Sequence, residues 1–287
     1  MPELPEVETI ARGVNARVRG ERILEVWFSS HLQPFKTPAR RQAKQLVDRR
    51  IQSVHRTGKH IVVELGPQRA ASGTLDPPLK EDGSVTAQWI VHLGMTGSLL
   101  VTTPEAAPAK HTHARLTLES GRELRFVDPR RFGRLEFRDL SRSAGFVGPG
   151  AEPLAIKARE FAALFHNRKL AIKAALLNQK LLAGVGNIYA DESLFLARIR
   201  PRRKAGRLTR QELEDLRQAL KQILENAIRL GGSSVSDYVG ADGERGFFQL
   251  EHCVYQRTGQ PCRRCGNPIR RILIAGRSTH YCGQCQR

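Results

Sequence analysis

Four cysteines near the C-terminal end of the chain constrain its fold more than any other feature. They are arranged as Cys262-x2-Cys265-x16-Cys282-x2-Cys285, a spacing typical of a four-cysteine zinc site. The alternative is a pair of disulfides, but paired Cys-x-x-Cys motifs in a reducing compartment are more often metal sites. The pattern therefore predicts a small zinc-binding domain at this end. The fifth cysteine, Cys253, is expected to be a plain buried thiol.

The charge balance points to a polyanionic partner. The chain carries 47 basic and 28 acidic residues, a formal net charge of +19, so DNA, RNA or an anionic membrane is expected to bind it. The sequence has no apolar run of ~18 residues, so we expect no membrane-spanning helix. Aromatic residues make up only 6% of the chain, which argues against a platform for stacking single-stranded bases. Contact with the backbone of duplex nucleic acid fits better.

The first half of the chain combines one helix with many short strands. Residues 5–18 have apolar side chains at helical spacing. The β-like runs cover residues 23–28, 51–65, 88–93, 98–102, 114–118, 123–127 and 134–137. Short strands separated by turn signals predict a β-sandwich or barrel. Residues 68–86, rich in proline and glycine, are expected to form a mobile loop without a direct role.

The second half is mainly helical. The glycine-rich stretch 145–150 is expected to link two domains, in line with the chain length. Residues 172–182 and 188–196 are expected to be helices joined by 183–187. Thr209-x-x-Glu212 is a capping box that opens a long helix ending near residue 231. Residues 269–274 and 278–281 are expected to form a hairpin with the zinc ligands.

The sequence Pro-Glu-Leu-Pro-Glu at 2–6 suggests a catalytic amine. Removal of Met1 would leave the secondary amine of Pro2 beside the carboxylate of Glu3, although Pro2 could also be merely a small residue after the initiator. An α-amine is far less protonated at pH 7 than a lysine, so it is the better nucleophile. Its attack on a sugar carbon would release a base and leave an iminium, and elimination could then cut the strand. Glu3 would transfer protons, whereas Glu6 either orients the terminus or is an ordinary first-turn acid.

Two turns carry side chains suited to duplex DNA. Asp-Pro-Arg-Arg-Phe-Gly at 128–133 displays Arg130, Arg131 and Phe132. An exposed phenylalanine is costly in water and would serve as a wedge in a base stack, unless it folds onto the core. Met95 is either a core residue or a flexible filler of the same kind.

Other candidates are less specific. The glycine-rich turn before residue 188 could present backbone N–H groups to a phosphate, and Asn187 could join it or simply cap the helix. Lys59 lies in a strand-like run and could be an ordinary solvated lysine. His111 and His113 alternate and so share one strand face, but a metal site there lacks an apparent third ligand.

Together these motifs resemble the formamidopyrimidine-DNA glycosylases, bacterial repair enzymes for oxidised purines, over essentially the whole chain. The resemblance rests on the motifs at 2–6 and 128–133, Gly-Lys at 58–59, His-Leu-Gly-Met-Thr-Gly at 92–97, Gly-Val-Gly-Asn-Ile-Tyr-Ala at 184–190 and the terminal cysteines. The chain departs modestly from the pattern. His60 stands where many relatives have tyrosine or phenylalanine, and segment 68–86 is longer than expected.

The resemblance implies a bifunctional enzyme of base-excision repair. It would remove 8-oxoguanine and formamidopyrimidines from duplex DNA and cut the abasic site, through an iminium (Schiff base) on Pro2 and β,δ-elimination. Extrusion of the lesion is required because the sugar carbon is inaccessible within the base stack. The implied catalytic residues are Pro2, Glu3, Lys59 and Arg277, with Glu6 at the active site. The implied DNA contacts are His111, Arg130, Arg131, Phe132, Met95, Lys173 and Asn187.

The implied fold is α+β with two domains. An N-terminal β-sandwich flanked by helices would cover 2–140, followed by a linker at 141–152. A helix–two-turn–helix module would cover 153–250, with a lesion-capping loop at 231–248, and a zinc-ribbon-like finger would cover 251–287. One structural zinc ion is implied, and its four cysteine ligands leave no open position for chemistry.

The implied partner is double-stranded DNA with oxidised or abasic sites, bound by a monomer in the bacterial cytoplasm and nucleoid. The start of the chain suggests no secretory leader. One alternative is the endonuclease VIII branch, which prefers oxidised pyrimidines, but Leu4 and the set Met95, Arg130 and Phe132 favour the purine enzyme. The other is a non-catalytic damaged-DNA-binding protein, which a retained Met1 would produce by blocking the amine.

Overall fold

The computed structural model describes residues 1–31, 34–68, 84–234 and 240–287, which form two compact units. The first unit holds residues 1–2, 6–147 and 234–246, and the second holds residues 3–5, 148–233 and 247–287. Most of the expected loop at 68–86, and residues 235–239 of the expected lesion-capping loop, lie outside the described residues. In the described parts of the chain, no helix combines the length and apolar character that a membrane crossing requires.

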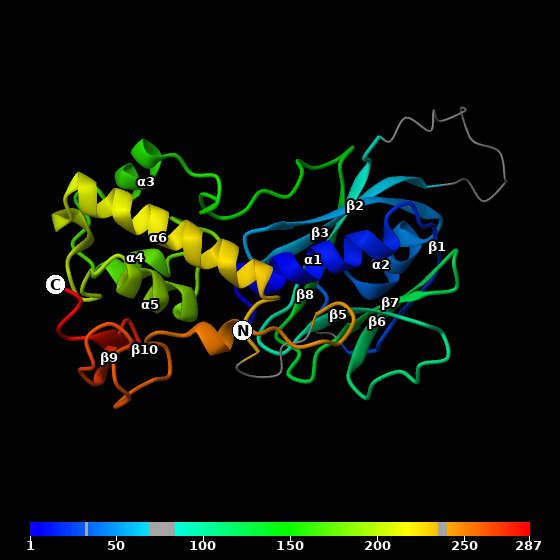
Figure 1. Ribbon diagram of the computed structural model, residues 1–287. Helices are drawn as coiled ribbons and strands as arrows, with labels where there is room; N and C mark the ends of the chain where they lie inside the picture. Colours follow the sequence, from blue (N-terminus) through cyan, green and yellow to red (C-terminus); the bar gives the residue numbers. More distant parts are fainter. Residues whose placement is uncertain (32–33, 69–83, 235–239) are drawn as a thin grey trace. The chain divides into compact units, whose positions relative to one another are not determined.

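Two antiparallel sheets form the first unit, with strand orders β1-β6-β7-β5 and β2-β3-β4-β8 (Figure 1). Helices α1 and α2 flank them, and side chains of α1 and both sheets share one core that includes Ile10, Trp89 and Phe126. The expected β-sandwich flanked by helices is confirmed. The elements are α1 (Leu4–Val18), β1 (Ile23–Phe28), α2 (Ala39–Leu46), β2 (Arg49–Thr57), β3 (His60–Gln68), β4 (Ala87–His92), β5 (Ser98–Thr102), β6 (Thr112–Leu118), β7 (Glu123–Val127) and β8 (Arg134–Asp139).

The single strand expected over 51–65 is wrong, because the chain turns back within it. β2 pairs with β3 from Thr57 and His60 outward. Gly58 makes the turn at φ +59°, in the left-handed region that glycine adopts without strain. Lys59 therefore lies in a tight turn and not in a strand. The sequence did carry a signal for this turn, because the non-apolar residues 55–60, with Gly58 among them, separate two apolar runs.

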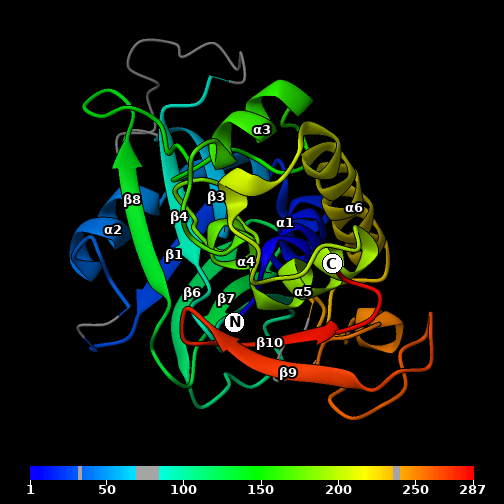
Figure 2. The same cartoon turned by 90° about the vertical axis from the view of Figure 1, so that its left-hand side faces the viewer.

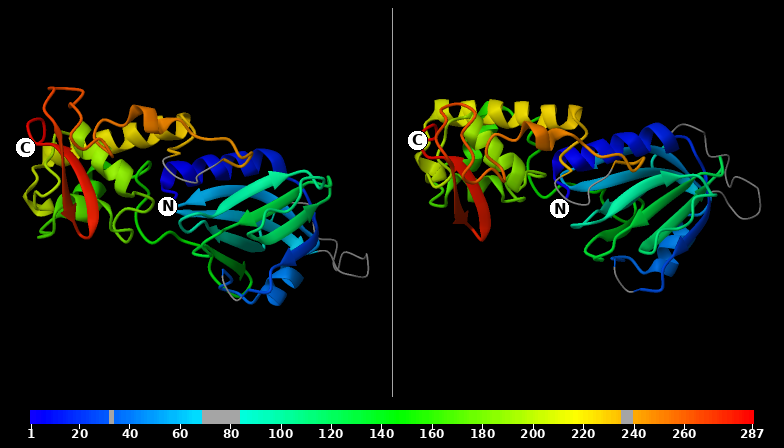
Figure 3. Two further views of the ribbon diagram at one scale, coloured as in Figure 1. Left: turned by 90° about the horizontal axis from the view of Figure 1, so that it is seen from below. Right: turned by 60° about the horizontal axis from the view of Figure 1, so that its bottom comes forward.

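The second unit is helical and ends in a small hairpin (Figure 2). The long helix α6 opens with the expected capping box, since Thr209 Oγ1 accepts from Glu212 N at 3.2 Å and Glu212 Oε2 accepts from Thr209 N at 2.8 Å. The hairpin β9–β10, red in Figure 3, packs through β10 against α5. The elements are α3 (Ala158–Phe165), α4 (Ile172–Leu176), α5 (Asn187–Leu196), η1 (Ala205–Arg207), α6 (Arg210–Arg229), η2 (Phe248–Glu251), β9 (Ile269–Ile274) and β10 (Arg277–Cys282).

The helix expected over 172–182 is shorter than predicted. α4 ends at Leu176, and the chain then forms a loop that leads to α5. Gln179 holds this loop: its Nε2 donates to Val185 O at 2.7 Å, and its Oε1 accepts from Gly184 N at 3.0 Å. The side-chain amide thus binds backbone groups near the end of this loop. This loop delivers the chain to the first turn of α5.

Candidate functional site

The four cysteines converge at the base of the β9–β10 hairpin. Their sulfur atoms all lie within 4.8 Å of one another, with Sγ–Sγ separations of 3.9 Å for Cys262–Cys285 and 3.5 Å for Cys265–Cys282. Tetrahedral zinc with Zn–S bonds of about 2.3 Å needs sulfur atoms about 3.8 Å apart, whereas a disulfide needs about 2.05 Å. The group therefore fits one structural zinc ion and excludes the disulfide alternative. Cys253, expected to be buried, is half-buried and stands outside the group.

The turns that carry Met95 and Phe132 are fastened to each other. Asp128 is fully buried, and its carboxylate accepts from Thr96 Oγ1 at 2.7 Å and from Gly133 N at 2.7 Å. The two backbones are so close that a Cβ at position 94 would lie 2.5 Å from Gly133 N. Asp128 therefore ties both turns into one support, a role that the sequence analysis did not assign.

The two turns that Asp128 joins carry a group of exposed side chains. Met95 is 42% exposed and Phe132 is 48% exposed. The guanidinium carbon of Arg130 lies 4.7 Å from the centre of the Phe132 ring, within range of a cation–π contact. The structure thus brings together the three side chains expected to intercalate, and Phe132 does not fold onto the core.

The two histidines near this support differ in environment. His111 is exposed and lines a hollow of about 450 Å³ together with Arg131. His113 is buried, with Nε2 3.1 Å from Asp128 O and Nδ1 3.1 Å from Ser29 Oγ, and burial lowers its pKa. Among the described residues, the only group able to offer three or more ligands to a metal is the four cysteines. His111 is therefore open to solvent, whereas His113 supports the turn.

The remaining candidates of the first unit are largely buried. Lys59 is 8% exposed and Glu6 is 2% exposed, so neither is an ordinary solvated side chain. Pro2 is buried and follows an exposed Met1, which makes its nitrogen an amide here. The ring centres of His60 and His92 lie 4.8 Å apart with the rings tilted by 50°, and burial lowers the pKa of both imidazoles to about 4.

In the second unit, the carboxylate of Glu3 occupies the N-terminus of α5. Glu3 is 5% exposed, and its Oε1 accepts from Ile188 N at 3.3 Å. A Cβ at position 186 would overlap the Glu3 carboxylate, so only glycine leaves room for it. A helix N-terminus stabilises negative charge. The glycine-rich turn therefore holds the carboxylate of Glu3, where the sequence had suggested a phosphate.

Lys173 is fully buried, contrary to the expectation of a DNA contact. Its Nζ lies 2.7 Å from Asp191 Oδ1 and donates to Ser278 O at 2.8 Å and to Thr279 Oγ1 at 2.9 Å. Burial lowers the pKa of Lys173, while Asp191 and Glu3 act in the opposite direction. The ammonium thus ties α4 and α5 to β10 from inside the unit, and in this arrangement it does not face a phosphate.

Asn187 and Arg277 lie beside this buried pair. Asn187 Nδ2 donates to Ser278 O at 3.0 Å, so its amide joins α5 to β10 rather than capping its own helix. Arg277 begins β10, is exposed, and is close enough to influence the pKa of Lys173 and of Tyr255. The first turn of α5 therefore gathers Asn187 and Arg277 near Glu3 and Lys173.

Comparison with known proteins identifies the family. Three family profiles match: the formamidopyrimidine-DNA glycosylase N-terminal domain over residues 1–135, its H2TH domain over 147–239, and the zinc finger found in FPG and IleRS over 259–287. The formamidopyrimidine-DNA glycosylase of Solibacter usitatus is 42% identical over 288 residues, which is 100% of both chains. The chain belongs to the formamidopyrimidine-DNA glycosylase family.

Solved structures of this family have the same fold. A complex between Lactococcus lactis Fpg and an abasic site containing DNA matches with a TM-score of 0.84 and 32% identity, over 99% of each chain. A complex of the wild-type Lactococcus lactis Fpg with an N7-benzyl-Fapy-dG containing DNA matches with a TM-score of 0.83 and 32% identity, over 100% of each chain. These glycosylases confirm the α+β class, the helix–two-turn–helix unit and the zinc finger.

Sequence reasoning missed two acids that organise this glycosylase. Asp191 Oδ2 accepts from His280 N at 2.8 Å, and Glu192 accepts from the backbone N–H groups of Cys253, Val254 and Tyr255 at 2.8–2.9 Å. Both acids are buried. The sequence carried a signal for these acids, because they interrupt the mainly apolar helix α5. Acids that are buried need hydrogen-bond or ion-pair partners, so such an interruption indicates a structural role. Their partners lie too far along the chain to be read from spacing.

Proposed function

We propose that this chain excises oxidised purines from duplex DNA and cuts the resulting abasic site, using the amine of Pro2 as nucleophile after removal of Met1. The chain is a DNA glycosylase of base-excision repair, as its full-length relatives are. The purine preference rests on the name of the family and of its relatives, because the Lactococcus lactis relative is seen both with a formamidopyrimidine-containing DNA and with an oxidized pyrimidine containing DNA. We place its action in the cytoplasm, as a monomer.

The observation that carries the catalytic proposal is the position of the Glu3 carboxylate at the N-terminus of α5, which we call the seat of Glu3. A carboxylate adjacent to the nucleophilic residue is fixed at a helix N-terminus, by a backbone N–H and a glycine that leaves room for it. Fixed geometry is what a proton-transfer group requires, because it must act within hydrogen-bond reach of the reacting atoms. The backbone N–H of Ile188 and the space left by Gly186 therefore keep the Glu3 carboxylate in one position for proton transfer.

The proposed reaction proceeds in two stages. The lone pair of the Pro2 nitrogen forms a bond to C1′ of the extruded nucleotide, and the bond from C1′ to the base breaks with its electrons going to the base. Glu3 takes the proton from the Pro2 nitrogen and passes it to the sugar ring oxygen, so that the ring opens as the nitrogen lone pair forms the iminium. Loss of a C2′ proton then expels the 3′ phosphate, and a second elimination expels the 5′ phosphate.

The other candidate residues either contact the DNA or hold the structure around the site. We propose that Met95, Arg130 and Phe132 fill the space left by the extruded base. The group formed by Lys59, His111, Arg131, Asn187 and Arg277 is proposed to hold the backbone and lesion. Lys173 would act as a positioning residue, because its buried ammonium fixes β10 relative to α5. The zinc ion, held by the four cysteines, would supply only the fold of the hairpin.

The test compares excision of an oxidised purine with excision of an oxidised pyrimidine, and the processed wild-type chain with a variant of Pro2. Duplexes carrying 8-oxoguanine opposite cytosine and dihydrothymine opposite adenine are incubated with the processed chain and with Pro2→Gly. We expect faster excision of 8-oxoguanine, and slow excision but near-normal DNA binding by Pro2→Gly, which retains an α-amine. Preference for dihydrothymine would overturn the purine assignment, and an unimpaired Pro2→Gly would remove Pro2 from the mechanism.

A further inference from the structure

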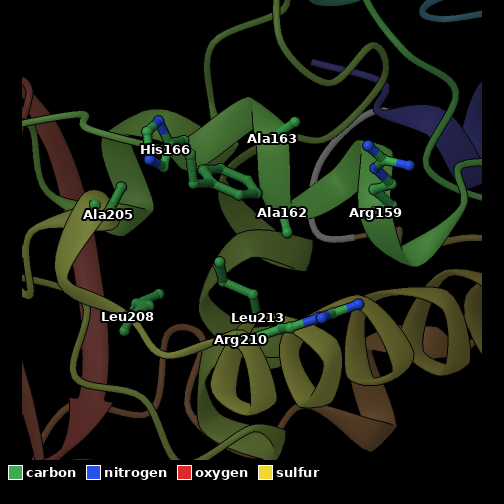
Figure 4. Close-up of a pocket in the computed structure, with 10 residues that line it drawn as sticks. Arg159, Ala162, Ala163, His166, Ala205, Leu208, Arg210 and Leu213 are labelled. Atoms are coloured by element: carbon green, nitrogen blue, oxygen red, sulfur yellow. The ribbon is translucent and has the colours of Figure 1, made fainter.

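A hollow of about 490 Å³ lies in the second unit between α3, η1 and the start of α6 (Figure 4). Its inner surface is apolar: Phe165, Leu208 and Leu213 contribute largely buried side chains. Arg159 and Arg210 stand at its edge and are exposed. The volume is within the range of sites that bind small ligands or anchor side chains.

The two charged residues that line the hollow, Arg159 and Arg210, are both basic. None of the residues that line it is acidic. Among the described residues, no ion pair or side-chain hydrogen bond engages Arg159 or Arg210, whereas the nearby Glu212 is already paired with Arg203. Of the other acids nearby in the sequence, Glu160 accepts from Lys157 N, Glu214 is paired with Arg217, and Asp191 and Glu192 are buried. Two arginines are therefore available to an anionic partner.

The residues that line the hollow are not among the DNA-binding residues proposed for this unit. Asn187 is the first residue of α5, whereas the lining residues Ala205 to Leu213 follow its C-terminal end in the chain. No lining residue has a part in the proposed chemistry.

We propose that this hollow docks an acidic segment of a partner protein, with one large apolar side chain in the hollow and neighbouring carboxylates on Arg159 and Arg210. Duplex DNA offers phosphates to the arginines but no apolar group to fill the interior. A second copy of this chain is disfavoured, since each copy carries a net charge of +19. An acidic segment with an apolar anchor matches both the charge and the apolar interior.

The test uses three fluorescein-labelled peptides at about 150 mM salt, where long-range attraction is screened. The probe is Asp-Glu-Asp-Glu-Leu-Phe. Asp-Glu-Asp-Glu-Ser-Ser keeps the charge without the anchor, and Asn-Gln-Asn-Gln-Leu-Phe keeps the anchor without the charge. We expect the probe to bind at least about tenfold more tightly than either control, since both the apolar and the charged contacts contribute. Equal binding of the serine peptide would overturn the proposal, because it would show only general attraction to a basic protein.

Variants locate the site. In Arg159→Glu/Arg210→Glu we expect probe binding to weaken at least about tenfold. Both positions are in the first turn of a helix, where an acid is electrostatically favoured, so the variant is expected to stay folded. Arg142→Glu/Lys221→Glu changes the net charge equally at exposed ion pairs elsewhere and should bind normally. Equal weakening by both variants would refute the location.

A filling variant and a competitor complete the design. Ala162 lines the hollow, and its side chain points toward Leu213 (Figure 4). Ala162→Phe should occlude the interior and abolish the preference for the probe over the serine peptide. A saturating undamaged duplex should leave probe binding unchanged. Displacement by the duplex would show that the hollow belongs to a nucleic-acid surface instead.

Discussion

Replacement of Gly186 by alanine should separate catalysis from folding. The backbone at this position is extended, with φ −130° and ψ −162°, so alanine is tolerated there without backbone strain. Its Cβ, however, would overlap the carboxylate of Glu3. Non-bonded carbon atoms need about 3.5 Å, so the flexible side chain of Glu3 must retreat by ~1 Å or more.

That displacement sets the size of the effect. A misplacement of ~1 Å costs about 10²-fold in rate, which corresponds to about 2.7 kcal/mol at the transition state. The contact from Ile188 N to Glu3 Oε1, 3.3 Å long, would also be lost, at a cost of about 1 kcal/mol in stability. We therefore expect a small decrease in melting temperature, of about 2–4 °C, with a large loss of activity.

The assay is single-turnover excision of 8-oxoguanine opposite cytosine, with thermal melting and binding to an abasic-analogue duplex measured in parallel. Gly184→Ala is the matched control. Its φ is +89°, and its Cβ would lie 2.8 Å from the Cβ of the core residue Leu4, so it should lose stability instead, by about 1–3 kcal/mol. Wild-type excision by Gly186→Ala would refute the role assigned to the seat of Glu3.

Three further changes test other parts of the structure. Cys262→Ser should abolish zinc binding and weaken affinity for any duplex; unchanged zinc content by atomic absorption would contradict the site. Asp128→Ala leaves the donors of Thr96 and Gly133 without their acceptor, so we expect a loss of about 1–3 kcal/mol and weaker binding of lesion duplex, measured by unfolding and anisotropy; undiminished affinity would argue against one shared support. Burial lowers the pKa of His252 to about 4, whereas an unfolded imidazole titrates near 6.5. The unfolded state therefore takes up the proton first as pH falls, and stability is lost between pH 6.5 and 4, by up to about 1.4 kcal/mol per pH unit. In urea unfolding at pH 7 and 5, His252→Leu should lose less stability than wild type, and an unchanged pH dependence would exclude His252 as a source.

Local patterns predicted the parts of the fold that depend on neighbouring residues. The spacing of the cysteines predicted the metal site, and the capping box Thr209-x-x-Glu212 predicted the start of α6. Both signals consist of residues that lie only three positions apart in the sequence, within each Cys-x-x-Cys pair and within the capping box. The turn at Gly58 was missed although the non-apolar residues 55–60 separate two apolar runs there. α2 was also missed, since only Gln42 and Leu46 of that helix are buried and two residues carry little periodicity.

The site could be predicted in its residue types but not in its internal support. Asp128, Asp191 and Glu192 act through partners that the fold brings close, and for Asp191 the partner His280 is 89 residues away. Burial of Lys173 is equally invisible in sequence, because a lysine is exposed unless a carboxylate and acceptors meet it. The expected domain limits and the roles of individual residues stay predictions.

The central claim is that Pro2 attacks the sugar, and borohydride trapping tests it most directly. The purified chain, with Met1 shown to be absent by N-terminal sequencing, is mixed with a duplex carrying 8-oxoguanine opposite cytosine in the presence of sodium borohydride. We expect a covalent protein–DNA adduct that peptide mass mapping assigns to Pro2, because reduction fixes the iminium. Absence of an adduct while the duplex is bound, or an adduct on a lysine, would contradict the account.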